Sequence, residues 1–95
     1  MMTFEWDNSK ARANARKHGV TFEEARSIFF DAHARLIPDP DHSEEEDRFA
    51  MLGASERSRV LIVCHCYRAN ESVIRIISAR KASKTEQCMY KDHLP

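Results

Sequence analysis

The sequence lacks the features of a membrane or secreted protein. Its 95 residues contain no apolar run near the roughly 20 residues that a membrane-spanning helix requires. The first ten residues, MMTFEWDNSK, show neither the basic start nor the apolar block of a secretory signal peptide. We therefore expect a soluble cytoplasmic protein. The length predicts a single domain over residues 1–95, with one hydrophobic core.

Cysteine is also scarce, and the three cysteines do not form a disulfide framework. Cys64 and Cys66 lie two residues apart, and Cys88 stands alone. In a β-strand the side chains of Cys64 and Cys66 point to one face and His65 to the other, which disfavours a shared metal ion. The pattern is typical of buried thiols. We expect neither a metal ion nor another cofactor.

Several motifs of familiar enzymes are absent as well. The chain has no glycine-rich dinucleotide motif, no Walker loop, no nucleophile elbow and no H-E-x-x-H zinc motif. The segment 39–47, DPDHSEEED, superficially resembles a calcium loop but lacks the required glycine. Most of its acidic residues are expected to lie in a solvated turn.

The chain lacks a net charge, but its charged residues are distributed unevenly along the sequence. The 15 Lys and Arg residues balance the 15 Asp and Glu residues. The segment 39–47 nevertheless holds six acids and no Lys or Arg, whereas residues 57–91 hold eight Lys or Arg and two acids. A second basic cluster consists of Lys10, Arg12, Arg16 and Lys17. Such local patches can attract an anionic partner, although a zero net charge argues against unspecific coating of nucleic acid.

The pattern of apolar and capping residues predicts the order strand, helix, helix, four strands, helix. A strand over 3–6 precedes a helix that Asp7 caps and Gly19 ends. The second helix begins with a capping box of Thr21 and Glu24. The remaining elements are strands within 32–40, 48–54, 59–67 and 72–80, and a last helix with a capping box of Ser83 and Glu86. Short turns join the last three strands, so we expect an α+β fold whose antiparallel sheet is covered on one face by two helices.

The last strand carries arginines along its length. Strict alternation places Arg75 on one face, with Val73, Ile77 and Ala79, and Arg80 on the other, with Ile74, Ile76 and Ser78. Arg80, Lys81 and Lys84 lie close to the start of the last helix, where an anion is favoured. This corner therefore predicts a phosphate site. The alternative is that the arginines are solvated or salt-bridged.

Four further residues are candidates for proton transfer or for structural roles. His65 shares a strand face with Leu61 and Val63, which is typical of a structural histidine; on an open face it could act as a general acid or base. Glu86 and Tyr90 meet on one helix face. Their alternatives are a capping residue and a helix-to-sheet packing residue. His18 most simply favours the C-terminus of its helix.

Several blocks of the sequence closely resemble the BrnT toxins. They are FEWD (4–7), Lys10, Asn14, KHG (17–19), FEEA (22–25), FFD (29–31), DPDHSEEEDRF (39–49), IRIISARKA (74–82), Glu86 and Tyr90. The resemblance implies a bacterial type II toxin–antitoxin component with a compact RelE-like fold and ribonuclease activity. It also implies an antitoxin similar to BrnA, with a ribbon-helix-helix DNA-binding part, in a heterotetramer that represses its own operon.

Together these observations lead us to expect a metal-independent endoribonuclease that arrests growth. Such a reaction needs a base, cations that stabilise the phosphorane, and an acid. Arg75 and Arg80 are expected to contact phosphate, and His65, Glu86 and Tyr90 to transfer or position protons. The residues expected to bind RNA are Arg68, Lys81, Lys84, Lys10, Lys17 and His18. The alternative is a non-catalytic subunit that binds the antitoxin and acts as a co-repressor.

Overall fold

A computed structural model describes residues 2–41 and 47–95 of the chain. The elements are β1 (Thr3–Glu5), α1 (Asn8–His18), α2 (Phe22–Ser27), the 3₁₀ helix η1 (Ile28–Phe30), β2 (Arg35–Ile37), β3 (Phe49–Ala54), β4 (Val60–Arg68), β5 (Val73–Lys81) and α3 (Lys84–Asp92). This order confirms the predicted succession of strands and helices, and η1 is an addition to it. Within the described ranges, no helix has the length and apolar character needed to cross a membrane.

The helix ends follow the predicted caps. The Asp7 carboxylate accepts a hydrogen bond from the Lys10 N–H at 3.0 Å, and Gly19 ends α1 in the left-handed region at φ 68°. The Thr21 hydroxyl accepts from the Glu24 N–H, but this capping box is only half formed. The carboxylate of Glu24 is instead held by the Arg59 guanidinium and the Ser55 hydroxyl.

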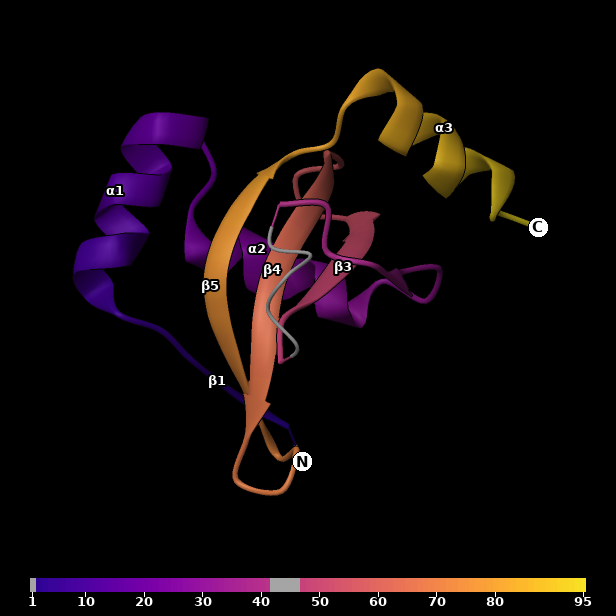
Figure 1. Cartoon of the computed structure of the whole chain (residues 1–95). Helices are drawn as coiled ribbons and strands as arrows, with labels where there is room; N and C mark the ends of the chain where they lie inside the picture. The colour runs from indigo at the N-terminus through magenta and orange to yellow at the C-terminus, as the bar shows by residue number, and fades with distance from the viewer. Residues whose placement is uncertain (1, 42–46) are drawn as a thin grey trace.

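The five strands form one mixed sheet in the order β1-β5-β4-β3-β2 (Figure 1). Three neighbouring pairs are antiparallel, but β1 runs parallel to β5. The expectation of a purely antiparallel sheet is therefore wrong for β1. Short turns determine the direction of the meander strands, whereas β1 pairs with a strand at the other end of the chain and no hairpin constrains it.

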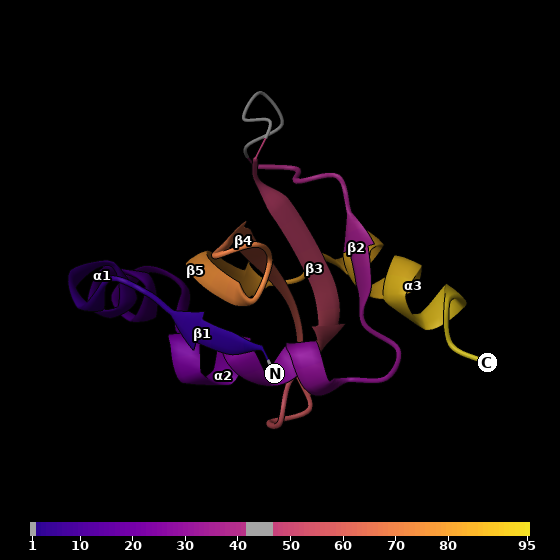
Figure 2. The same cartoon turned by 90° about the horizontal axis from the view of Figure 1, so that it is seen from below.

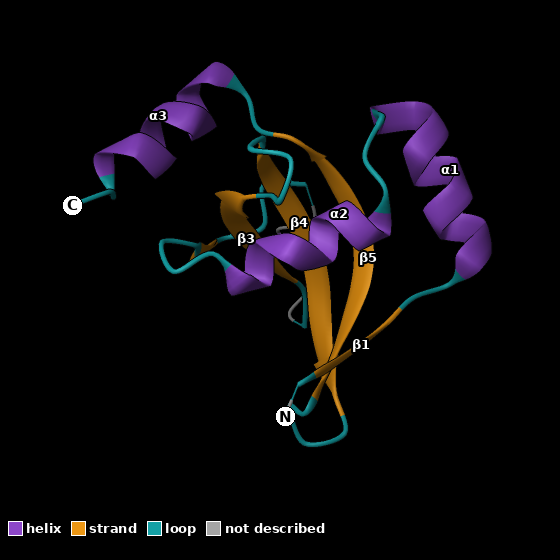
Figure 3. Cartoon of the chain, turned by 180° about the vertical axis from the view of Figure 1, so that it is seen from behind, coloured by secondary structure: helices purple, strands orange, loops and turns teal. Residues whose placement is uncertain are grey.

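The helices take three different positions around the sheet. Figure 3 shows α2 crossing one face, which we call the α2 face, while α1 lies beside β5. Figure 2 shows α1 and α3 at opposite ends of the molecule. The expectation that two helices cover one face holds fully only for α2. Helix α1 flanks the edge of β5, with Ala11 packed against the apolar residues under α2, and α3 packs on the opposite face.

Each face of the sheet has its own apolar cluster. The cluster under α2 and η1 consists of Val20, Phe22, Ala25, Ile28, Leu61, Val63, Ile74, Ile76 and Ala79. The cluster on the opposite face consists of Ala50, Leu52, Ile62, Ala82 and Tyr90. Burial of apolar area on both faces is the main source of stability in a sheet of this kind.

Strand β5 has one residue more than its partner at the centre of the sheet. Cys64 pairs with Ser78, while the next residue of β4, His65, pairs with Ile76. Ile77 is therefore the additional residue of a β-bulge. One inserted residue reverses the side-chain alternation between the two halves of the strand.

The bulge brings the two arginines of β5 to the same face. Arg75 pairs with Cys66 and Arg80 pairs with Ile62, and these two β4 residues are four apart in an unbroken strand. Ile62 belongs to the apolar cluster opposite α2. The expectation that Arg75 and Arg80 lie on opposite faces is wrong, because it assumed an uninterrupted period of two.

A buried asparagine of α1, Asn14, continues the hydrogen bonding of the sheet along the second half of β5. Strand β1 covers only Val73–Arg75 of β5, so the backbone of Ala79 has no neighbouring strand on the side away from β4. The Asn14 side chain accepts from the Ala79 N–H at 3.0 Å and donates to its carbonyl oxygen at 2.8 Å. It also donates to the Val20 carbonyl oxygen at 3.0 Å. Asn14 therefore fixes α1 against the second half of β5.

We predict that Asn14→Ala lowers the free energy of unfolding by about 2–4 kcal/mol, because buried backbone groups lose their partners. Urea unfolding followed by circular dichroism measures this change. The control is Asn8→Ala, which alters an exposed asparagine of the same helix and should remain within about 0.5 kcal/mol of the wild type. Equal effects of the two substitutions would contradict the role of Asn14.

Candidate functional site

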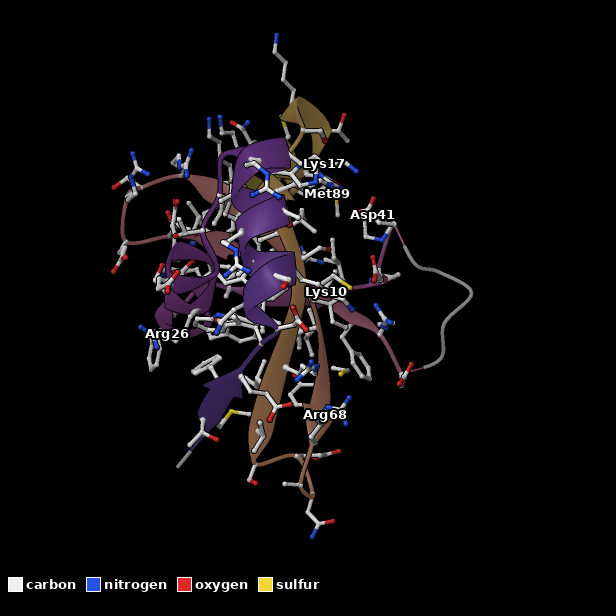
Figure 4. The ribbon with its side chains drawn as sticks, turned by 90° about the vertical axis from the view of Figure 1, so that its left-hand side faces the viewer. Lys10, Lys17, Arg26, Asp41, Arg68 and Met89 are labelled. Atoms are coloured by element: carbon white, nitrogen blue, oxygen red, sulfur yellow. The ribbon has the colours of Figure 1, made fainter. Side chains whose placement is uncertain are left out.

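A cleft of about 600 Å³ lies between α1 and the second half of β5. It is lined by Lys10, Lys17, His18, Asp41, Arg48, Ile77, Ser78, Ala79 and Arg80. Figure 4 looks onto α1 and shows Lys10 and Lys17 on the side of the helix where Asp41 lies. The lining thus contains four Lys or Arg side chains and one carboxylate. Such a concave, mainly cationic surface attracts anions.

Arg80 is held in the cleft by two carboxylates. Its Nη1 and Nη2 donate to the two carboxylate oxygens of Glu86 at 2.7 and 2.9 Å. Its Nε donates to Asp41 Oδ2 at 3.0 Å. These bonds raise the pKa of Arg80 still further above its ordinary value, chiefly through Glu86. The guanidinium is therefore permanently charged and held in one orientation.

Glu86 has two structural tasks at the start of α3. Its carboxylate accepts from the Ser83 N–H at 2.8 Å, while the Ser83 hydroxyl accepts from the Glu86 N–H, which confirms the predicted capping box. The Arg80 guanidinium lowers the pKa of Glu86 to about 2. The anion predicted at this helix start is thus provided by the chain itself, and Glu86 is ionised near neutral pH.

Arg75 and Arg68 lie on the same face as Arg80 but outside the cleft lining. Both approach one carboxylate oxygen of Glu5, Arg75 at 2.7 Å and Arg68 at 3.5 Å. These side chains are 31% and 57% exposed, so water weakens the attraction of both pairs. They form a second cationic patch toward the β4–β5 turn, where Figure 4 places Arg68.

His65 is completely buried on the α2 face. Its ring lies edge-on to Phe29, with the centroids 4.9 Å apart. Because a carbonyl oxygen can only accept, Nδ1–H donates to the Val63 carbonyl, and Nε2 pairs with the Tyr67 hydroxyl. Burial lowers the pKa of His65 and favours the neutral ring. The sheet separates His65 from the cleft. Its surroundings are those of a structural histidine rather than of a general acid or base on an open face.

Tyr90 joins α3 to the rest of the fold. Its hydroxyl donates to Asp31 Oδ2 at 2.6 Å, and the same oxygen accepts from the Ala54 N–H. Burial and the neighbouring carboxylate raise the pKa of Tyr90 to about 12. The ring packs in the apolar cluster opposite α2. These contacts agree with the alternative of a helix-to-sheet packing residue.

The other predicted RNA-binding cations divide into two groups. Lys10, Lys17 and His18 line the cleft, whereas Lys81 and Lys84 are exposed where β5 leads into α3. The predicted RNA-binding cations of these two groups thus lie on α1 and on the segment that joins β5 to α3.

Two residues of the cleft lining and one buried neighbour of Asp41 were not predicted from the sequence. Arg48 lines the cleft, although it was predicted only as the first residue of a strand. Asp41 also lines the cleft, although most acids of the segment 39–47 were expected to lie in a solvated turn. Asp39 is buried and accepts from the Cys64 thiol at 3.0 Å, which contradicts that expectation for this residue. The segment 42–46 lies outside the described residues. The signal that could have found Asp39, Asp41 and Asn14 was their place in the blocks that resemble the BrnT toxins.

Cys64 and His65 occupy opposite faces of the sheet. Cys64 hydrogen-bonds to Asp39 on the face away from α2, while His65 lies under η1. In the parts of the chain that the structure describes, no three His, Cys, Asp or Glu side chains gather as metal ligands.

A mixed five-stranded sheet with helices around it and a cationic cleft beside β5 define a small α+β protein. A family model described as "Ribonuclease toxin, BrnT, of type II toxin-antitoxin system" matches residues 6–86. The chain belongs to this family, which confirms the resemblance stated above. It is a BrnT-type ribonuclease toxin, and a type II system implies an antitoxin partner.

A solved structure supports the fold. The chain is similar to the Brucella abortus ribonuclease toxin BrnT, known from a crystal structure at 1.1 Å, with a TM-score of 0.68. The two chains share 23% identity, and the match covers 88% of this chain and 100% of the other. A comparison with curated proteins finds no match.

We predict that the Arg80–Glu86 pair makes the free energy of unfolding fall as the pH is lowered. The folded pKa of Glu86, about 2, lies below its ordinary value of 4.5, so the contribution is complete above about pH 4.5 and is lost as the pH falls toward 2. Between about pH 6 and about pH 3 the loss should be about 2 kcal/mol. Glu86→Gln should remove this part of the pH dependence of urea unfolding.

The matched control is Glu56→Gln, which neutralises an exposed carboxylate in the β3–β4 turn. It should keep the acid dependence of the wild type. If both variants lose stability toward acid as steeply as the wild type, the pair does not contribute in this way.

Proposed function

We propose that the chain is a metal-independent endoribonuclease that binds the RNA backbone in the cleft between α1 and β5. The observation that carries this proposal is the position of Arg80, fixed by Glu86 at a cleft lined by Lys10, Lys17 and Arg48. The family supplies the ribonuclease activity. The RNA backbone carries one negative charge at each phosphodiester, so it is a polyanion that a row of such cations can bind.

The reaction can be written from the groups in the cleft. A base takes the proton of the 2′-hydroxyl, the 2′-oxygen forms a bond to phosphorus, and the bond from phosphorus to the 5′-oxygen breaks as that oxygen gains a proton. Arg80, Lys10 and Lys17 stabilise the charge of the phosphorane. His18 is the candidate for proton transfer because it lines the cleft.

Three predicted catalytic residues receive positioning or packing roles in this proposal. Glu86 holds Arg80 in place, and its pKa of about 2 makes it a poor proton carrier near neutral pH. His65 and Tyr90 stabilise the two faces of the sheet. Arg75 contacts RNA away from the reacting phosphate.

The exposed cations around the cleft extend the proposed RNA surface. Arg68 lies near the β4–β5 turn, and Lys81 and Lys84 lie near the start of α3. We propose that these three side chains bind flanking phosphates. Contacts of this kind contribute affinity without reading the base sequence.

The proposed partner is an antitoxin similar to BrnA that covers the cleft. Masking the cleft would neutralise its charge and exclude RNA in one step. We further propose that the pair forms a heterotetramer in the cytoplasm and contacts operator DNA through the ribbon-helix-helix part of the antitoxin. A relation to RelE-type folds stays part of this proposal.

We predict that Arg80→Ala abolishes RNA cleavage by the purified protein in the presence of EDTA. The double variant Lys10→Ala/Lys17→Ala should retain the fold and bind single-stranded RNA with a salt slope reduced by about 1.4, since two phosphate contacts are lost. Cleavage of labelled RNA and binding at several salt concentrations measure these effects. Lys91→Ala, an exposed lysine of α3, is the control and should match the wild type.

The rival function is a non-catalytic subunit that binds the antitoxin and acts as a co-repressor. The observation that favours it is that two carboxylates already engage Arg80. Induction of the toxin without its antitoxin separates the two functions. We expect growth arrest with the wild type and normal growth with Arg80→Ala. Normal growth with abundant wild-type protein, together with intact RNA in vitro, would support the rival.

A further inference from the structure

The carboxylate of Asp41 lies among the cations of the cleft. It accepts a hydrogen bond from Arg80 Nε and lines the cleft together with Lys10, Lys17 and Arg48. It comes from the segment that follows β2, on the side of the cleft opposite α1. The chain therefore places one of its own anions at the position that a bound anion would take.

The geometry of Arg80 separates its two carboxylate partners. Glu86 binds the end of the guanidinium through Nη1 and Nη2, with one bond to each of its oxygens. The other edge, formed by Nε and Nη2, is engaged by Asp41 through the single Nε bond of 3.0 Å. An anion with two adjacent oxygens can use both donors of this edge, as phosphate groups commonly do.

We propose that Asp41 occupies a phosphodiester subsite of the cleft and that an RNA phosphate binds there by displacing its side chain. The inference rests on the proposed function, because it assigns one position within the proposed RNA site. In the free chain, Asp41 keeps this subsite closed. The phosphate replaces one carboxylate oxygen, bound through Nε alone, with two non-bridging oxygens on the same edge of Arg80.

Displacement does not require the segment to leave the protein. Asp39 anchors it separately, since its Oδ1 accepts from the Asp41 N–H at 2.9 Å and its Oδ2 accepts from the Cys64 thiol at 3.0 Å. The Asp41 side chain is 42% exposed, against 13% for Glu86. Rotation of one half-exposed side chain therefore opens the subsite, while Glu86 continues to hold Arg80.

Because the Asp41 side chain occupies the subsite, the apparent affinity for phosphate equals the intrinsic affinity multiplied by the fraction of molecules in which the subsite is open. Removing the charge of Asp41 should raise that fraction. We expect Asp41→Asn to bind inorganic phosphate about twofold to fivefold more tightly than the wild type, the effect of one half-exposed ion pair. Titration of the full chain with phosphate, followed by the amide NMR signals of Ser78 and Arg80, measures this.

The matched control is Asp92→Asn, which removes the same charge from an exposed position in α3. It should bind phosphate as the wild type does. Equal affinities of Asp41→Asn and Asp92→Asn overturn the proposal, as does tighter binding that leaves the Ser78 and Arg80 signals unchanged. Circular dichroism and thermal unfolding verify that both variants are folded.

A second measurement separates this inference from the proposed function. An RNA oligonucleotide with 2′-O-methyl substitution at every position cannot be cleaved by attack of a 2′-hydroxyl, so it reports binding alone. Tighter binding of phosphate and of this oligonucleotide by Asp41→Asn supports the subsite, even if intact RNA is never cleaved. Cleavage of RNA by the wild type with no gain of affinity in Asp41→Asn supports the proposed function and overturns the subsite.

Discussion

The cleft depends on the hydrogen bonds between Asn14 and the backbone of Ala79. The amide replaces the strand neighbour that β1, paired only with Val73–Arg75, does not provide. Because these groups are buried, water cannot substitute for a missing partner, and the contact is costly to break. It also fixes the distance between the two walls of the cleft, α1 with its lysines and β5 with Arg80. One side chain thus links the stability of the fold to the spacing of the proposed phosphate contacts.

Local signals predicted the elements and their ends, because a cap depends on residues two to four positions away. Asp7, Gly19 and Ser83 act as expected. The parallel pairing of β1 and the bulge at Ile77 depend on contacts between distant parts of the chain, and no local pattern reveals them. The bulge matters most, since a single added residue changes the face of every side chain that follows.

Three cations of the candidate site, Lys10, Lys17 and Arg80, were predictable, but Arg48 and the carboxylate partners of Arg80 were not. The basic clusters of α1 and β5 meet in the cleft because the fold brings those two segments together. Asp41 belongs to a segment whose composition suggests a solvated turn, and only its tertiary contact with Arg80 distinguishes it. The neighbours of His65 indicated its face correctly. Its complete burial follows from Phe29 packing over the ring, which alternation along one strand does not specify.

The two carboxylates around Arg80 have different physical consequences. Glu86 is shielded and bound by two bonds, so it orients the guanidinium and also secures the start of α3. Asp41 is half-exposed and bound by one, so it offsets charge without being fixed in place. Cations gathered in one cleft repel each other and reduce the stability of the free chain. A nearby carboxylate relieves that repulsion when the cleft is empty, and a phosphate can relieve it when RNA is bound. The excess of positive charge in the cleft therefore has two effects: it lowers the stability of the free chain, and it attracts an anionic substrate.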